Sequence, residues 1–224
     1  MKVSIIIPVL NEAKSIGLVI DAIPKSMASE IVIVDNGSTD DSVVIARSKG
    51  AKVVHEFRRG YGRACLTALK ALDHPDAVVF LDGDYSDYPE ELPQLITPIA
   101  EGQADFVLGS RVLGSWEKHS IHPEVLWRNR VACFFIRLLF KTRYTDVGPF
   151  RAIRSSVLEG LKMSDLSHGW NIEMQLKAAK RGVKIVEVPV RYRVRVGESK
   201  LSTSYRGSVL ATFKTFWTLA RHIL

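Results

Sequence analysis

The stretch AVVFLDGDYSDYPE (77–90) joins five consecutive apolar residues to a run that is rich in acidic ones. Apolar residues in a row are typical of a strand buried on both faces, as in a parallel sheet that helices cover on each side. The acidic run would then lie at the carboxyl end of this strand. Residues 89–100 have the length and amphipathic pattern of a helix, so the stretch predicts a strand, a loop and a helix in succession.

The same alternation extends outward from this stretch and predicts an α/β fold with a mostly parallel sheet and right-handed crossovers. The predicted strands are KVSIIIPV (2–9), EIVIV (30–34), AKVV (51–54), AVVFL (77–81) and DFVLG (105–109), and the predicted helices are 12–23, 40–48, 61–72 and 89–100. Past residue 111 the alternation breaks. There follow WRNRVACFFIRLLF (127–140), a polar loop to 150, a helix near 170–181, IVEVPVRYRVRV (185–196) and a basic amphipathic tail.

Charge is distributed unevenly along the 224 residues. Residues 1–110 carry 10 Lys and Arg against 16 Asp and Glu, whereas residues 111–224 carry 21 against 8. A second half this basic indicates contact with anions, either substrate phosphates or an acidic membrane surface. Nucleic acid is not expected as a partner, because the basic residues are not interleaved with the aromatic ones that single-strand platforms need.

The length favours one domain over the whole chain, 1–224. No stretch reaches the roughly 18 uncharged apolar residues of a spanning helix, and Pro8 interrupts the apolar start in a way that fits a strand better than a signal peptide. We therefore expect a cytoplasmic protein, or one that is peripheral on the cytoplasmic face of a membrane. Cys65 and Cys133 have neither disulfide nor metal-ligand spacing and are predicted to be buried thiols.

Polar side chains follow each predicted strand, where open parallel sheets bind their ligands. Asp82 and Asp84 are two residues apart, so in an extended backbone both side chains point the same way, roughly 6 to 7 Å apart. A divalent cation such as Mg²⁺ or Mn²⁺, together with a diphosphate, fits between such carboxylates. Alone, the tripeptide is more simply an Asp-Gly turn. Its place after the fourth strand is what favours a metal site.

Two further strand-end runs have mixed interpretations. In VDNGSTDDS (34–42) the later residues are explained as a helix cap and first turn, but Asp35 would face the crevice and could accept a hydrogen bond from a base. RRGYGRA (58–64) could cradle a phosphate before a helix. It lacks the Lys and the spacing of a P-loop.

Taken in order, these motifs resemble the landmarks of family 2 glycosyltransferases, and most closely the dolichyl-phosphate mannose synthase-like branch. Members of that branch move a hexose from a GDP- or UDP-sugar to a polyprenyl phosphate. The resemblance implies a GT-A fold, Rossmann-like with helices on both sides of the sheet. It also implies that 1–110 is the nucleotide-sugar-binding half and 111–224 the acceptor-side half, ending in a basic amphipathic helix. The motifs are PVLNE (8–12), VDNGSTD (34–40), RGYGRA (59–64), DGDYSDYPE (82–90), GSR (109–111), TDVGPFRAI (145–153) and EVPVRYRVRVGESKLS (187–202).

The resemblance implies roles for residues on the donor side. Asp82 and Asp84 would bind the metal ion and the diphosphate, which places Asp84 at the reacting centre. Ser86 stands where the branch often has a Gln near the metal, and we include it in the nucleotide-sugar site. The residues that would line the nucleoside pocket are Pro8, Leu10, Glu12, Val34 and Asp35.

On the other side of the reaction, Arg111 and Arg151 would neutralise phosphate charge, and a loop with Lys200 would close over the donor or acceptor phosphate. Arginine suits this because it contacts phosphate through two parallel hydrogen bonds. A lipid phosphate is already ionised, whereas a hydroxyl acceptor must lose a proton to a base. Asp146 and Glu173 are the candidates for that base.

The sequence thus predicts a metal-dependent, inverting hexosyltransferase that acts on a polyprenyl phosphate or another membrane-proximal acceptor. Two alternatives remain: the same donor chemistry on a soluble hydroxyl acceptor, and a non-catalytic nucleotide-binding protein of the same fold. The stretches CFFIRLLFK (133–141) and 205–224 place basic residues among bulky apolar ones. Such segments lie in a membrane interface, or pack on the domain or in a homodimer seam.

Overall fold

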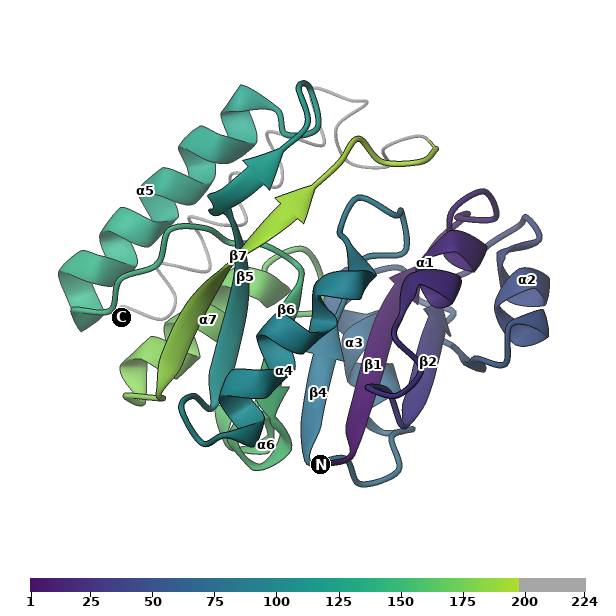
Figure 1. The fold of residues 1–224 in the computed structure, drawn as a ribbon, viewed down its shortest axis with the longest axis horizontal. Helices are drawn as coiled ribbons and strands as arrows, with labels where there is room; N and C mark the ends of the chain where they lie inside the picture. Colours follow the sequence, from purple (N-terminus) through teal and green to yellow (C-terminus); the bar gives the residue numbers. More distant parts are fainter. Residues whose placement is uncertain (198–224) are drawn as a thin grey trace.

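The structure is a computed structural model that describes residues 1–197. A seven-stranded sheet, in the order β3-β2-β1-β4-β6-β5-β7, lies between helices on both faces (Figure 1). The strands are β1 (Val3–Val9), β2 (Glu30–Asp35), β3 (Lys52–His55), β4 (Ala77–Phe80), β5 (Phe106–Trp116), β6 (Arg151–Arg154) and β7 (Ile185–Tyr192). The helices are α1 (Ile16–Ala22), α2 (Ser42–Ser48), α3 (Tyr61–Leu69), the 3-10 turn η1 (Pro89–Glu91), α4 (Leu92–Ala100), α5 (Pro123–Phe140), α6 (Ser155–Leu161) and α7 (Trp170–Lys180).

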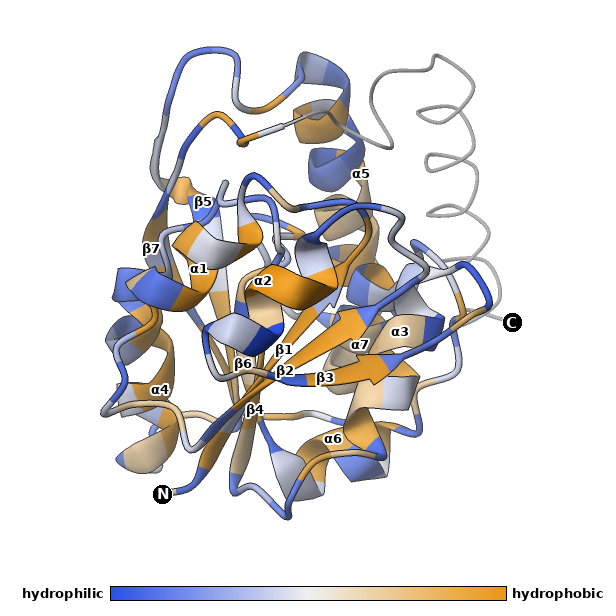
Figure 2. Ribbon diagram, turned by 90° about the vertical axis from the view of Figure 1, so that its right-hand side faces the viewer, coloured by the Kyte–Doolittle hydropathy of each residue, from blue (hydrophilic) through white to orange (hydrophobic). Residues whose placement is uncertain are grey.

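Side chains of the central strands alternate between two core layers. Ile5 and Ile7 of β1 pack in the layer that contains α1, α2 and α4, whereas Ile6 packs in the layer that contains α3, α6 and α7. Figure 2 shows the hydrophobic strands between these helices. Full burial of one such side chain stabilises the fold by roughly 1.5–3 kcal/mol. The uninterrupted apolar runs of the sequence therefore require helices on both faces, and the predicted α/β fold with a mostly parallel sheet is confirmed.

The sequence did not predict β6, the strand that connects the second half of the chain to the sheet of the first half. β6 lies between β4 and β5 and is antiparallel to both. Its first residue, Arg151, is the partner of Phe80 at the end of β4. The preceding polar loop therefore arrives at the carboxyl end of β4, next to Asp82.

The outer pair of strands forms a wall above the sheet. β5 extends well past its predicted end, becomes irregular between Ser110 and Ser115, and pairs with β7 again as far as Trp116 and Tyr192. A Cβ on Gly114 would lie 2.0 Å from the Val190 carbonyl oxygen, so only glycine allows this approach. The extended β5–β7 pair places Arg111 and Tyr192 beyond the end of the central strands.

Three smaller predictions can be compared with the described residues. The segment 127–140 lies within α5, which begins at Pro123, with proline at the start of the helix, where its missing N–H costs nothing. Cys65 and Cys133 are buried free thiols, as predicted. Among residues 1–197, no helix combines the length and the apolar character needed to cross a bilayer.

Candidate active site

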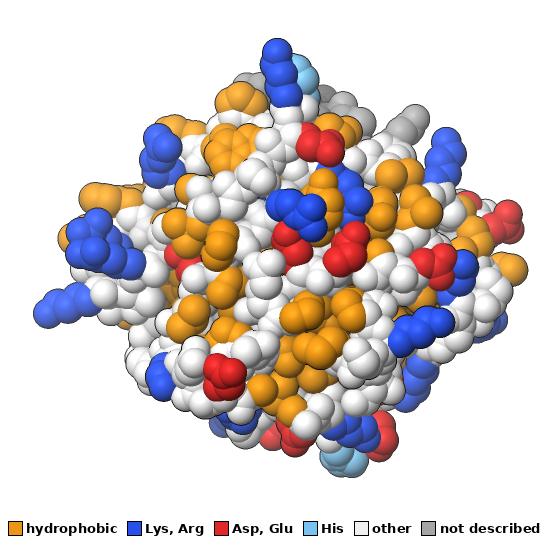
Figure 3. All heavy atoms as spheres, in the orientation of Figure 1, with side chains coloured by type: hydrophobic (Ala, Val, Ile, Leu, Met, Phe, Trp, Pro, Cys, Tyr) orange, Lys and Arg blue, Asp and Glu red, His pale blue; other side chains and the backbone are white. Residues whose placement is uncertain are grey.

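A pocket of about 710 Å³ opens at the carboxyl ends of the strands. β1 lies between β2 and β4, so the sheet grows in opposite directions on its two sides. Open α/β sheets bind ligands at such a switch point, and this volume is within the range of small-molecule sites. Figure 3 shows acidic and basic side chains gathered beside each other above the strand ends.

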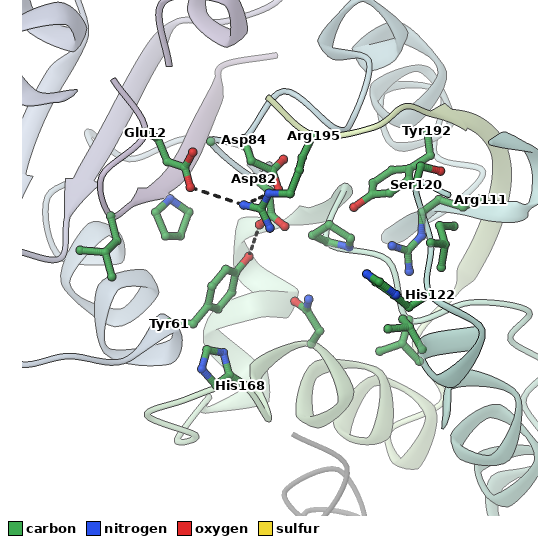
Figure 4. Close-up of a pocket in the computed structure, with 18 of the residues that line it drawn as sticks. Glu12, Tyr61, Asp82, Asp84, Arg111, Ser120, His122, His168, Tyr192 and Arg195 are labelled. Carbon is green, nitrogen blue, oxygen red and sulfur yellow. Dashed lines mark hydrogen bonds and ion pairs between the residues drawn. The ribbon is translucent and has the colours of Figure 1, made fainter. Parts of the chain in front are cut away.

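The donor corner, which we define as Glu12, Asp82, Asp84 and Arg195, lies at one end of the pocket (Figure 4). Nη2 of Arg195 is 2.9 Å from Oδ2 of Asp84 and 3.5 Å from Oε1 of Glu12. Burial and the charge of Asp84 raise the pKa of Asp82 to about 7. Removal from water and like charge both disfavour the ionised carboxylate, so this corner is built to receive positive charge.

Short contacts fix the two aspartates of this corner. A Cβ on Gly83 would lie 3.1 Å from Cγ2 of Val9, so the loop passes close to β1. The backbone N–H and the hydroxyl of Ser86 donate to Oδ1 of Asp84 at 2.9 and 2.5 Å. The Tyr61 hydroxyl donates to Oδ1 of Asp82 at 3.2 Å. Ser86 therefore orients a carboxylate and does not line the pocket.

The donor corner fits a divalent cation that is bound together with a diphosphate. A cationic guanidinium already lies against Asp84, which shows that the carboxylates can hold positive charge at this place. In residues 1–197 no group of three or more His, Cys, Asp or Glu could hold a metal by itself. Mg²⁺ commonly takes only one or two carboxylates and completes its shell with substrate phosphates and water. Asp82 and Asp84 are the pair that would hold it here.

The opposite end of the pocket is basic and is organised around Arg111. Nε and Nη2 of Arg111 donate to the two oxygens of Asp146 at 2.7 and 2.9 Å, and the Asn129 amide donates to Asp146 at 2.7 Å. Burial alone would raise the pKa of Asp146, but the charge and hydrogen bonds of Arg111 hold it below its usual value. Tyr192 lies with its ring centroid 4.9 Å from the guanidinium. Arg111 is thus held in one orientation at the pocket wall.

Asp146, one of the two predicted bases, is engaged in contacts of its own. Its side chain is fully buried, and its oxygens accept hydrogen bonds from Arg111, Asn129 and the Val147 N–H. A general base needs an oxygen within reach of the acceptor proton. In this geometry Asp146 positions Arg111, and its role as a base stays a prediction that no contact in the structure supports.

Glu173, the other predicted base, is also engaged away from the pocket. It accepts hydrogen bonds from the backbone N–H groups of Ser164 and Asp165 at 3.1 and 2.8 Å and pairs with Lys177 at 2.8 Å. Burial opposes ionisation, but these contacts lower the pKa of Glu173. Its carboxylate holds the loop before α7, and the structure does not place it in the pocket.

Arg151 is likewise engaged in contacts of its own. It is completely buried and donates to the carbonyl oxygens of Gly148 and, at 2.9 Å, of Asn171. Burial lowers its pKa to about 10, which still leaves the guanidinium charged at neutral pH. Arg151 is not among the residues that line the pocket, so its predicted contact with phosphate stays a prediction. It fixes the loop that carries Asp146.

The predicted nucleoside residues are divided between the pocket and the sheet. Pro8, Leu10 and Glu12 line the pocket, whereas Val34 and Asp35 do not. Asp35 accepts a hydrogen bond from the Ser38 N–H at 2.8 Å and pairs with His55 at 3.1 Å. Its neighbour Asn36 lines the pocket in its place. Lys200 and the tail 205–224 lie outside the described residues.

In the motif RRGYGRA, Arg59 and Gly60 line the pocket, whereas Gly62 packs against the segment before α7. A Cβ on Gly62 would lie 1.9 Å from the Asp165 carbonyl oxygen, and the Gly62 N–H donates to the Ser167 carbonyl at 3.1 Å. This N–H is therefore not available for a phosphate. The same contact brings His168 to the pocket beside Tyr61 (Figure 4).

Sequence reasoning missed several lining residues, among them Tyr61, Arg195, Arg128 and His122. Tyr61 and Arg195 lie within motifs that were recognised, but no spacing rule points to their side chains. Arg128 and His122 come from the start of α5, whose approach to the strand ends depends on tertiary packing. Figure 4 shows His122 on the side of the pocket that holds Arg111 and Tyr192.

A solved glycosyltransferase has the same arrangement of sheet and helices. Glucosyl-3-phosphoglycerate synthase from Mycobacterium tuberculosis, solved with Mn²⁺, UDP-glucose and phosphoglyceric acid, matches 99% of this chain with a TM-score of 0.78. The match covers 79% of that chain at 24% identity, a likeness that shows the GT-A fold. The fold of this protein is thus of the GT-A class.

The chain belongs to glycosyl transferase family 2, which it matches over residues 4–161. It is 35% identical over 223 residues to an uncharacterized glycosyltransferase of Mycobacterium tuberculosis, and the match covers 96% of each chain. It is also 33% identical over 214 residues to a dolichyl-phosphate hexose transferase of Haloferax volcanii, with 92% of this chain and 90% of the relative covered. The second relative supports the resemblance to the polyprenyl-phosphate branch.

Proposed function

We propose that this protein transfers a hexose from a nucleotide diphosphate sugar to a polyprenyl phosphate, with inversion and with Mg²⁺ or Mn²⁺ at Asp82 and Asp84. The observation that carries the proposal is the two-ended pocket, with carboxylates at one end and Arg111 and Arg128 at the other. The acidic end suits a cation with its diphosphate. The basic end suits an acceptor that is itself an anion.

The residues of the donor end bind and orient the leaving group. Pro8, Leu10 and Asn36 line the pocket and would contact the nucleoside. The divalent cation, when bound, stabilises the negative charge that builds on the leaving diphosphate. Asp82 and Asp84 are already oriented for this role, because hydrogen bonds from Tyr61 and Ser86 fix their carboxylates.

The residues of the basic end would orient the acceptor. An acceptor phosphate oxygen attacks the anomeric carbon from the face opposite the diphosphate, so one C–O bond forms as another breaks and the nucleoside diphosphate leaves. Such an oxygen is already ionised and needs no base. This agrees with the geometry, since Asp146 and Glu173 are both held in other hydrogen bonds. Arg111 would keep the acceptor phosphate near the sugar.

The acceptor is tested directly by a transfer assay. Purified protein is incubated with Mn²⁺, one radiolabelled donor (GDP-mannose, UDP-glucose or UDP-N-acetylglucosamine) and either a short-chain polyprenyl phosphate or 3-phosphoglycerate. We expect one donor to give a labelled lipid that organic solvent extracts, and at least tenfold less water-soluble product. Transfer mainly to 3-phosphoglycerate would replace the lipid acceptor by the soluble one. No transfer, together with no calorimetric binding of any donor, would favour the non-catalytic alternative.

The outer face of α5 supports a membrane-proximal acceptor. Trp127, Phe134 and Leu138 are exposed to 60%, 60% and 65%, and the exposed basic residues Arg130 and Arg137 lie among them. Figure 3 shows hydrophobic and basic side chains together along the edge where Figure 1 places α5. Helices of this kind bind in the interface of acidic bilayers, where both apolar burial and charge contribute. We propose that α5 rests on the membrane that carries the acceptor.

Replacing Phe134 and Leu138 by Ser is expected to weaken binding to phosphatidylglycerol-containing vesicles by about tenfold or more, because two apolar anchors are lost. Co-flotation with the vesicles measures the effect. The control is Leu18→Ser on α1, an exposed leucine that lies away from α5 and should leave binding unchanged. If the double variant floats like the wild type, or if it changes only the oligomeric state in gel filtration, the face is not a membrane surface.

A further inference from the structure

Arg195 is held in the donor corner by the backbone on either side of it. The N–H of Val196 donates to the Asp84 carbonyl and the N–H of Arg193 to the Ser86 carbonyl, both at 2.9 Å. The chain after β7 therefore runs beside the loop after β4. Arg193 does not compete for the corner, because its guanidinium lies 3.6 Å from the ring centroid of Tyr85. Arg195 is the side chain that this path directs at Asp84.

The contacts of Arg195 are incomplete for a guanidinium at a carboxylate. One contact is short, at 2.9 Å to Asp84, and the other is long, at 3.5 Å to Glu12. Its Nε is buried without a hydrogen-bond partner. A guanidinium has five N–H donors and binds best through two parallel hydrogen bonds. The present arrangement offsets part of the negative charge of the corner and leaves Arg195 able to make better contacts elsewhere.

We propose that Arg195 and the divalent cation exchange at Asp84, so that Arg195 fills the metal's place until the donor arrives. This inference rests on the metal-dependent function proposed above. A guanidinium and a divalent cation at the same carboxylate repel each other, so a cation at Asp84 weakens the contact of Arg195. A bound diphosphate offers the displaced guanidinium a new bidentate partner.

The exchange has a thermodynamic consequence. A metal ion that enters alone must break the Arg195 contact with Asp84 and leave the guanidinium without a partner. When the metal ion enters together with a nucleoside diphosphate, the displaced guanidinium binds the diphosphate and is not left without a partner. Arg195 thus adds to the coupling between metal and nucleotide, and this coupling must be the same in both directions.

The test measures Mn²⁺ binding alone, from the electron paramagnetic resonance signal of the free ion. We expect Arg195→Gln to bind Mn²⁺ about tenfold more tightly than the wild type when no nucleotide is present. Arg195→Lys keeps the charge and should bind like the wild type. Arg191→Gln is the matched control, because Arg191 lies near the end of β7, just before the segment that carries Arg195, but pairs with Glu91 at 2.6 Å. A second set of measurements is made with GDP or UDP added. The nucleotide should increase the Mn²⁺ affinity less in Arg195→Gln than in the wild type.

A measurement on the wild type keeps the test independent of how the variants fold. Hydrogen exchange of the peptide that contains Val196 should become faster when Mn²⁺ and the nucleoside diphosphate are added, because its contact with the Asp84 loop loosens. Equal Mn²⁺ affinity in wild type and Arg195→Gln, with unchanged exchange, overturns the exchange proposal alone. If no protein binds Mn²⁺, with or without nucleotide, the metal-dependent function fails as well.

Discussion

Asp84→Asn is expected to lower kcat for sugar transfer by about 10³-fold, the largest effect on activity that we foresee. The substitution removes the negative charge that would hold the divalent cation. It keeps an oxygen that can accept the two hydrogen bonds from Ser86, at 2.9 and 2.5 Å, so the loop should retain its shape. A loss of activity would then report on charge and not on folding.

The measurement is the rate of sugar transfer at saturating donor, with calorimetric titration of the same donor in the presence and absence of Mn²⁺. Glu90→Gln is the matched control, because Glu90 is an acidic residue of the same segment that lies outside the pocket. We expect it to act like the wild type. Metal-dependent donor binding that survives in Asp84→Asn would remove Asp84 from the metal site.

Arg111→Met is expected to have the largest effect on stability, a loss of about 3–5 kcal/mol in the free energy of unfolding. The Asp146 carboxylate would stay fully buried without its bidentate partner. Removing both charges with Arg111→Met and Asp146→Asn together should be less harmful than the sum of the single changes, since the two residues form one network.

Urea denaturation followed by circular dichroism measures these free energies. Arg154→Met is the control, because Arg154 forms an ion pair with Asp105 at 3.0 Å that is about one third exposed on both sides. An exposed pair of this kind contributes 0–1 kcal/mol. A loss below 1 kcal/mol in Arg111→Met would mean that the buried pair does not stabilise the basic end, and that Arg111 is free to move.

The parallel part of the sheet was predictable because its signal is local. Runs such as Ile5-Ile6-Ile7 are buried on both faces, and each is followed by a helical pattern, so strand type and order in the chain follow from periodicity. β6 was missed for a physical reason. Its four residues, RAIR, have a charged residue at each end and make a strand only because β4 and β5 pair with both of its edges.

The site was predictable where a residue's position on a strand end decides its role. Asp82, Asp84 and Glu12 line the pocket because the carboxyl ends of β1 and β4 meet there. The charge of Arg151 did not predict its position, because an arginine at the start of a strand can face inward when backbone carbonyl oxygens accept its hydrogen bonds. No sequence pattern shows that Arg195 reaches Asp84, because 111 positions of chain separate them and tertiary packing brings them together.

The place of β6 in the sheet also bears on how the chain folds during synthesis. Its pairs with β4 join residues that are 71 to 77 positions apart, and β5 follows β4 in the chain but reaches the sheet only through β6. Until residue 154 has left the ribosome, the edge of β4 has no partner on that side. Such open edges invite pairing with other chains, and distant pairings slow folding. We therefore expect folding of this enzyme to be limited by a late closure of the sheet, with the emerging chain exposed to aggregation until then.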